Sequence, residues 1–188
     1  VFRLPIENED LQQCADSIMR VYGEYYYGKK AYNKITFPLG NGFIADFDKW
    51  RRGYSISVSG NKIAWVYSSK NDSSYDSFKR FMRIVFAYSG TLNMDYSSKK
   101  IKLVEARVGD IFVRGGSPGH VVMIADICKN KKGKKAYLLA QGYLPAQEFQ
   151  LLKNPLHEDD PWYYEDEIKY PLRTPEYSFD KGSLRRYK

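Results

Sequence analysis

Three residues that lie far apart in the chain, Cys14, His120 and Gln141, are of the types needed to hydrolyse an amide bond. Cysteine hydrolysis requires a thiol that attacks the carbonyl carbon, a base that removes the thiol proton, and a group that orients the base. Cys14 is the candidate nucleophile, His120 the candidate base and Gln141 the candidate orienting group. This set predicts hydrolysis through a covalent acyl-enzyme, provided that the fold brings the three residues together.

Cys14 lies near the start of a helix predicted at about residues 11–27, which Asp10 is placed to cap and Gly28 to end. Residues with helical spacing form its apolar side: Leu11, Cys14, Ile18, Tyr22 and Tyr25. The unpaired N–H groups and the dipole at a helix N-terminus lower the pKa of a thiol, which favours a nucleophile. A position on the apolar side also suits a small core residue, because free cysteine is among the most buried residue types. The spacing leaves both interpretations of Cys14 open.

The chain has only two histidines, and they lie in different settings. His157 is part of "LHEDD", an acidic segment typical of a surface loop. His120 follows the turn "GGSPG" and opens an apolar strand, a place from which a side chain can face a cleft beside closely approaching glycine backbone. A structural histidine at a strand edge is the alternative interpretation of His120.

Gln141 ends the apolar run "AYLLA" on the strand predicted to pair with that of His120. Its amide oxygen can accept a hydrogen bond from one ring nitrogen and so fix the tautomer of the imidazole. Asp126 shares the strand face of His120 by alternation, but six residues of strand place it about 20 Å away. We therefore expect Gln141, and not Asp126, to orient the His120 ring.

Stabilisation of an oxyanion requires N–H donors beside the reacting carbonyl. The candidates are the backbone N–H of Cys14 and the side chain of Gln12 or Gln13. Ser117, in the "GGSPG" turn, is a further candidate for oxyanion or substrate binding. Ser117 is not expected to be a nucleophile, because a strand follows it where a nucleophile elbow requires a helix.

The sequence contains few residues that could bind a metal ion or a cofactor. Two histidines and two cysteines, none at metal-ligand spacing, do not predict a zinc site. The glycine-rich turn lacks the lysine and the helix of a phosphate-binding loop. Cys14 and Cys128 do not form a disulfide framework, although a single bridge between them stays open. We expect no metal and no cofactor.

The composition predicts one globular domain with a basic surface. The chain has 188 residues, of which 43% are hydrophobic, and it carries a net charge of +8. Part of this charge lies in "KNKKGKK", which suits the solvated tip of a hairpin around Gly133. The charge favours anionic partners, but no nucleic-acid motif accompanies it and no apolar stretch approaches the length of a membrane span. We expect neither a specific nucleic-acid partner nor a transmembrane segment.

The order of the predicted elements indicates an α+β fold. After the first helix, "DFDKWRRG" predicts a short helix or turn, and "YSISVSGNKIAWVYS" predicts a hairpin. Ser73 or Ser74 caps a second helix that Gly90 ends. Three strands follow at "VGDIFVRGG", "GHVVMIADICK" and "KKAYLLAQGY", and the proline-rich tail is expected to wrap over the core. Helices followed by antiparallel strands are typical of α+β rather than of a parallel doubly wound sheet.

These motifs resemble the NlpC and CHAP cysteine peptidases and amidases, which have a papain-like fold. In those families a Gly-Asp pair opens one strand, a Gly-His pair opens the next, and a third polar residue follows on a hairpin partner. The matching positions here are Gly109-Asp110, Gly119-His120 and Gln141, and the Gln13-Cys14 pair is similar to the Gln-Cys of CHAP domains. Asp110 is expected to be structural, holding the turn before its strand.

The segments "DLQQCAD", "GGSPGH" and "PAQE" resemble domain-of-unknown-function family 4846, which is mostly bacterial. The two resemblances imply a single papain-like domain over 1–188, with an insertion at about 30–100 and a wrapping tail at about 154–188. The resemblance to NlpC and CHAP domains implies a cysteine peptidase or amidase acting on peptides such as those of the cell wall, in an extracytoplasmic compartment, whereas the resemblance to family 4846 supplies no activity by itself. The alternative is a non-catalytic module on the same fold that binds a polymer or peptide. Two departures bear on activity: "AD" follows Cys14, and Gln141 is a less common orienting residue than His or Asn.

Overall fold

The computed structural model describes residues 11–68 and 70–188, so the predicted helix cap Asp10 lies outside the described residues. The fold is α+β, as predicted. Its α-helices are α1 (Cys14–Gly28), α2 (Phe47–Trp50), α3 (Tyr75–Tyr88) and α4 (Thr91–Ser97). Short 3-10 helices lie at Tyr32–Lys34, Gly40–Gly42 and Leu103–Glu105.

The largest sheet of the described chain has seven strands in antiparallel pairs, in the order β10-β8-β7-β6-β13-β5, with β9 also paired to β8. The strands are β5 (Lys99–Lys100), β6 (Ile111–Arg114), β7 (His120–Lys129), β8 (Lys135–Gln141), β9 (Gln150–Leu151), β10 (Tyr163–Tyr164) and β13 (Leu184–Arg186). β7 and β8 pair through the basic turn, as predicted. β13 was not predicted: it brings the end of the tail between β6 and β5.

Three smaller two-stranded sheets lie around the large one. They are formed by β1 (Thr36–Pro38) with β2 (Ile44–Asp46), β3 (Tyr54–Ser59) with β4 (Lys62–Tyr67), and β11 (Leu172–Arg173) with β12 (Ser178–Phe179). The β3–β4 pair is the predicted hairpin. The strands of the tail are only two or three residues long, and prolines lie between β9, β10, β11 and β12.

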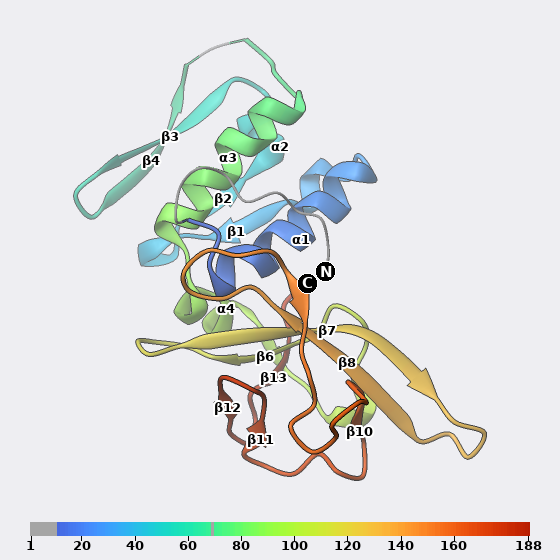
Figure 1. Ribbon diagram of the computed structural model, residues 1–188. Coiled ribbons are helices and arrows are strands. Elements are labelled where there is room, and N and C mark those ends of the chain that lie inside the picture. The colour runs from blue at the N-terminus through green and yellow to red at the C-terminus, as the bar shows by residue number, and fades with distance from the viewer. Residues whose placement is uncertain (1–10, 69) are drawn as a thin grey trace.

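Both faces of the central strands are buried, because alternate residues of β6 and β7 enter two different cores. Ile111, Val113, Val121 and Met123 face the core that contains α1 and α3, whereas Phe112, Val122 and Ile124 face the core formed with the tail. Figure 1 shows this arrangement: the helices lie on one side of the large sheet and the β11–β12 hairpin on the other. The face on which a residue of β7 projects therefore decides which segment it meets.

The region between α1 and the large sheet differs from the prediction at the end of α3. The hydroxyl of Ser74 caps α3 by accepting a hydrogen bond from the N–H of Ser77 at 3.2 Å, as one of the two predicted caps. Gly90 does not simply end α3: it is the N-cap of α4, a helix that the sequence analysis missed. Within the described residues, no helix has the length and apolar character that crossing a membrane requires.

Candidate active site

The N-terminus of α1 lies against the large sheet where β7 begins. Gln13 is the N-cap residue, and its backbone N–H donates to a carboxylate oxygen of Asp16 at 3.1 Å. Cys14 is the first residue of the helix and is half-buried. Its sulfur is close enough to the backbone N–H of Val121 to accept a hydrogen bond from it. Since Val121 follows His120, the thiol lies beside the opening of the strand that carries the predicted base.

The pKa of the Cys14 thiol is raised above its usual value, which corrects the expectation of a lowered pKa. Burial disfavours the thiolate and is the largest cause; the negative charge of Asp16 adds to it. Hydrogen bonds from backbone N–H groups, that of Ala15 first, stabilise the thiolate but do not outweigh burial. The helix N-terminus thus favours the thiolate, as predicted, but burial of Cys14 has the larger effect and keeps the thiol protonated.

His120 and Gln141 are joined by a hydrogen bond. Nε2 of the His120 ring lies 2.6 Å from Oε1 of Gln141, the contact expected from the predicted pairing of their strands. His120 is 3% exposed at the start of β7, and Gln141 is fully buried at the end of β8. Burial of the ring lowers the pKa of His120, although the Gln141 hydrogen bond and the charge of Glu176 act in the opposite direction. The imidazole is therefore held in place and is neutral near pH 7.

Aromatic rings enclose the His120 imidazole. The ring centroids of Tyr177, Tyr143 and Phe179 lie 5.1, 5.4 and 6.1 Å from that of His120. Tyr177 and Phe179 belong to the tail, so the imidazole projects on the tail side of the sheet, whereas its neighbour Val121 faces α1. The thiol thus lies on the α1 side of this strand end and the imidazole on its tail side, and within residues 11–68 and 70–188 no hydrogen bond joins Cys14 to His120.

A glycine holds the end of β8 against α1. A Cβ atom on Gly142, the residue after Gln141, would overlap the hydroxyl oxygen of Ser17 and lie 2.7 Å from its Cβ. Ser17 is buried in the first turns of α1 and its hydroxyl donates to the carbonyl of Gln12 at 3.3 Å. The close contact between Gly142 and Ser17 therefore brings the Gln141 strand end to the same helix turn that carries Cys14.

Glu176 is a site residue that the sequence analysis missed. The Nε2 amide group of Gln141 donates to a carboxylate oxygen of Glu176 at 2.9 Å, so a continuous row of contacts runs from His120 through Gln141 to Glu176. Glu176 lies 35 residues after Gln141, in the turn between β11 and β12. Nothing in the local sequence "RTPEYS" indicates this contact, because it depends on how the tail folds back over the sheet.

The predicted binding residues differ in their surroundings. Gln12 is 2% exposed; its Oε1 accepts a hydrogen bond from Arg20, and its Nε2 has no hydrogen-bond partner within residues 11–68 and 70–188. Gln13 is half-buried at the helix cap, and Ser117 is exposed in the loop between β6 and β7. Gln12 is therefore the candidate with a spare buried donor, two residues before Cys14.

The remaining predicted residues have structural contacts. Asp110 accepts from the N–H of Arg107 at 2.8 Å and pairs with Arg186, which confirms its expected role in the turn before β6. His157 contacts the Glu167 carboxylate at 2.7 Å and is partly exposed. Cys14 and Cys128 are both free, so the bridge left open by the sequence does not form. No cluster of three metal-ligating side chains lies in the part of the chain that the structure describes.

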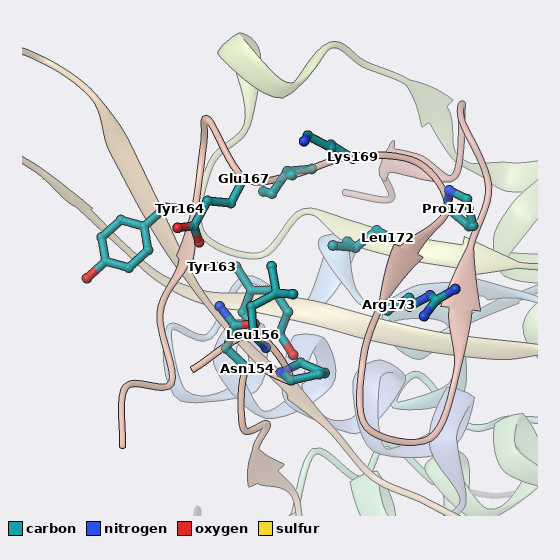
Figure 2. A pocket seen from close by; sticks show the side chains of 11 residues that line it. Asn154, Leu156, Tyr163, Tyr164, Glu167, Lys169, Pro171, Leu172 and Arg173 are labelled. Carbon is teal, nitrogen blue, oxygen red and sulfur yellow. Dashed lines mark hydrogen bonds between the residues drawn. The ribbon is translucent and has the colours of Figure 1, made fainter. Parts of the chain in front are cut away.

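Two cavities lie away from the Cys14 and His120 side chains. One of about 760 Å³ is lined by the C-terminal half of α1 and the middle of β7, including Tyr25 and Met123. Figure 2 shows the other, of about 150 Å³, within the tail between Tyr163 and Leu172. Its buried amide, Asn154, donates to the carbonyl of Trp162 and accepts from the N–H of Leu156, so this polar group is committed to holding the tail.

The family model described as Domain of unknown function (4846) matches residues 1–186 of the chain. The chain belongs to this family. The match covers all three residues of the predicted set and the tail that carries Glu176. No curated protein and no solved structure matches the chain. The description of family 4846 names no chemistry.

Iodoacetamide at pH 7 is expected to modify Cys128 of this family 4846 domain before Cys14. Cys128 is exposed on β7, whereas Cys14 is half-buried with a raised pKa, so little of its thiol is in the reactive thiolate form. Mass spectrometry of the two cysteine peptides over time measures both rates. Cys14→Ser should leave the fast phase unchanged, and faster labelling of Cys14 than of Cys128 would contradict a neutral, buried thiol.

Proposed function

We propose that this domain is a cysteine hydrolase that cleaves amide bonds, with Cys14 as nucleophile, His120 as base and Gln141 as positioning residue. The observation that supports the proposal most is the buried His120–Gln141 hydrogen bond at a strand opening where the Cys14 sulfur also lies. A thiol at a helix start, an imidazole and an amide that orients it are the three parts that such chemistry needs.

The proposed reaction has two halves. In the first, His120 takes the thiol proton as the Cys14 sulfur bonds to the carbonyl carbon; the C–N bond then breaks, and the imidazolium returns the proton to the leaving amine. In the second, water attacks the thioester, His120 accepts its proton, and the acid leaves as the sulfur is protonated again. The N–H of Cys14 and the spare Nε2 of Gln12 are the candidate donors to the oxyanion.

The protonation states favour a general-base mechanism over a resting ion pair. The pKa of the thiol is raised and that of His120 is lowered, so both groups are neutral at rest. A lowered pKa keeps His120 unprotonated, and so able to act as a base, down to below its usual value of 6.5. The rate should fall on the acid side only below that value, as the imidazole takes up a proton.

We infer a papain-like arrangement from three features in combination. The cysteine begins a helix that packs on an antiparallel sheet, the Gly-His pair opens a strand, and the orienting residue ends its hairpin partner. The resemblance to NlpC and CHAP domains adds the substrate class, peptides such as those of the cell wall, and an extracytoplasmic location. A net charge of +8 suits a substrate that is part of an anionic polymer.

Incubation with cell-wall stem peptides and their cross-linked forms tests the proposed function. Mass spectrometry should detect new amine and carboxyl ends, and rapid quenching should trap an acyl group on the peptide that contains Cys14. Gln141→Ala should slow turnover roughly 10- to 100-fold without abolishing it, because the base remains but is poorly oriented. Absence of cleavage together with specific binding of the same peptides would replace the proposal by its alternative.

That alternative is a binding module on the same fold. The raised pKa of Cys14 is the observation that favours it, because a buried neutral thiol is also what a core residue would have. In that case Cys14→Ala leaves peptide binding unchanged, and neither the wild-type protein nor any variant hydrolyses the peptides. The hydrogen bonds of Gln141 to His120 and to Glu176 would then serve only to hold β7, β8 and the tail together.

A further inference from the structure

The orientation of the Gln141 side chain follows from its second partner. An ionised carboxylate can only accept hydrogen bonds, so the group of Gln141 that faces Glu176 has to be the NH₂ group. The opposite end of the amide, Oε1, then faces Nε2 of His120 at 2.6 Å. Because Oε1 can only accept, Nε2 of the ring has to carry a proton. In the neutral ring the other nitrogen, Nδ1, is then the one with a free lone pair.

We propose that Glu176 is a positioning residue that acts through Gln141 to set the tautomer of His120, leaving Nδ1 as the basic nitrogen. Gln141 alone cannot do this, because an amide presents a donor or an acceptor equally well after a rotation of its end group. The carboxylate removes that choice. The inference rests on the proposed function for its catalytic meaning, since Nδ1 would be the nitrogen that takes the Cys14 proton.

The tail holds Glu176 in position to do so. The N–H of Thr174 donates to the carbonyl of Tyr177 at 2.8 Å and the Thr174 hydroxyl donates to the same oxygen at 3.0 Å, which closes the turn that carries Glu176. The hydroxyl of Tyr177 donates to the carbonyl of Pro118 at 3.3 Å. The turn is thus tied to the loop directly before His120, so the carboxylate and the imidazole keep a fixed separation.

Glu176 is also the only charged side chain that raises the pKa of His120 among the described residues, where burial lowers it. Its carboxylate acts on the ring without touching it, with Gln141 between them. A direct His–carboxylate contact does occur in this chain, between His157 and Glu167 on the surface. In the buried site the Gln141 amide lies between the carboxylate and the ring. Glu176 therefore fixes which end of the amide faces His120 but forms no direct ion pair with the ring.

Substitution at Glu176 separates its role as an acceptor from its charge. In Glu176→Gln a carbonyl can still accept from Gln141, so the Nε2–H tautomer of His120 should persist while its pKa falls. In Glu176→Lys an ammonium donor replaces the acceptor, so the Gln141 side-chain amide should flip and present its oxygen to the lysine. Its NH₂ group then faces Nε2 of His120, and the ring should change to the Nδ1–H tautomer. Position 176 is exposed, which allows both substitutions without disturbing the core.

Nitrogen-15 NMR of the histidine rings reads the tautomer directly, and the chain has only two histidines to resolve. Wild-type protein and Glu176→Gln should show a protonated Nε2 in His120, and Glu176→Lys a protonated Nδ1. Glu167→Gln is the matched control: it should alter the signals of His157 and leave those of His120 unchanged. If wild-type His120 carries its proton on Nδ1, or if Glu176→Lys leaves the tautomer unchanged, the proposal is overturned.

The kinetic result distinguishes the two proposals from each other. If the domain hydrolyses amides, Glu176→Lys should lower kcat at least about 100-fold, because the base nitrogen then carries a proton, while Glu176→Gln stays within roughly 10-fold. A tautomer change in a protein that cleaves no substrate supports the role of Glu176 and contradicts the proposed function. Hydrolysis by the wild-type protein, together with an unchanged His120 tautomer in Glu176→Lys, supports the proposed function and contradicts the role of Glu176.

Discussion

Cys14→Ala is expected to lower kcat/KM for amide hydrolysis by at least ~10⁴-fold, because no other group in the proposed site can form the acyl-enzyme. The melting temperature should change little, since Cys14 is half-buried at the edge of the core and alanine keeps the helix start intact. Hydrolysis rates and calorimetric unfolding of the same samples measure both effects.

The second cysteine of the chain provides the control for this substitution. Cys128→Ala removes an exposed thiol on β7 and should leave both the rate and the melting temperature unchanged. Full activity in Cys14→Ala would show that the hydrolysis does not proceed through this thiol. A large fall in melting temperature in Cys14→Ala would identify Cys14 as a core residue.

The local elements of the fold could be predicted because the signals that form them are local. The Gly60-Asn61 turn between two β-forming runs and the Ser74 cap before an apolar helical stripe both operate within a few residues. The strand β13 could not be predicted in the same way, because Leu184 and Arg185 are placed by pairing with β6, some seventy residues earlier in the chain.

The same distinction between local and long-range contacts applies to the residues of the candidate site. His120 and Gln141 lie on neighbouring strands joined by one turn, so the hairpin prediction was sufficient to bring their strand ends together. The register of β7 and β8, with its shift between Ile124 and Asp126, decides that the two side chains meet. Glu176 and Tyr177 reach the same site from the folded tail, and the sequence holds no pattern that aligns them with it. The direction of the Cys14 pKa shift was wrong for a related reason. A helix start is visible in the sequence, but the burial that opposes it is a property of the whole fold.

Gly119→Ala is expected to destabilise the protein by about 3 kcal/mol and to displace His120 at the same time. A Cβ atom on Gly119 would overlap the carbonyl oxygen of Gly116 and the hydroxyl of Thr91, and would lie 2.9 Å from the carbonyl oxygen of Arg114. Two of these neighbours are backbone atoms, so a rotation of a side chain cannot make room. The glycine-rich turn has to move away from α4, and His120, the next residue, moves with it.

A change of this size should appear in both stability and rate. For a domain of this length, about 3 kcal/mol corresponds to a fall of roughly 6–12 °C in melting temperature. A displacement of the base by ~1 Å should lower the rate on the order of 100-fold at a temperature where the variant is still folded. Calorimetry and rate measurements on the same preparation check the two effects together.

Two further variants show whether the crowding at Gly119 is the cause. Gly28→Ala at the end of α1, where an added Cβ meets no atom within 4 Å, should be neutral or stabilising by up to about 1 kcal/mol. Thr91→Ala combined with Gly119→Ala should recover only part of the loss, since the overlap with the backbone carbonyl oxygens remains. Full recovery in the double variant would show that the Thr91 hydroxyl alone requires glycine before His120, and wild-type stability in Gly119→Ala would contradict the close approach itself. Because Thr91 begins α4 and its hydroxyl donates to the carbonyl of Gly116 at 3.3 Å, either result measures how firmly α4 holds the turn that positions His120.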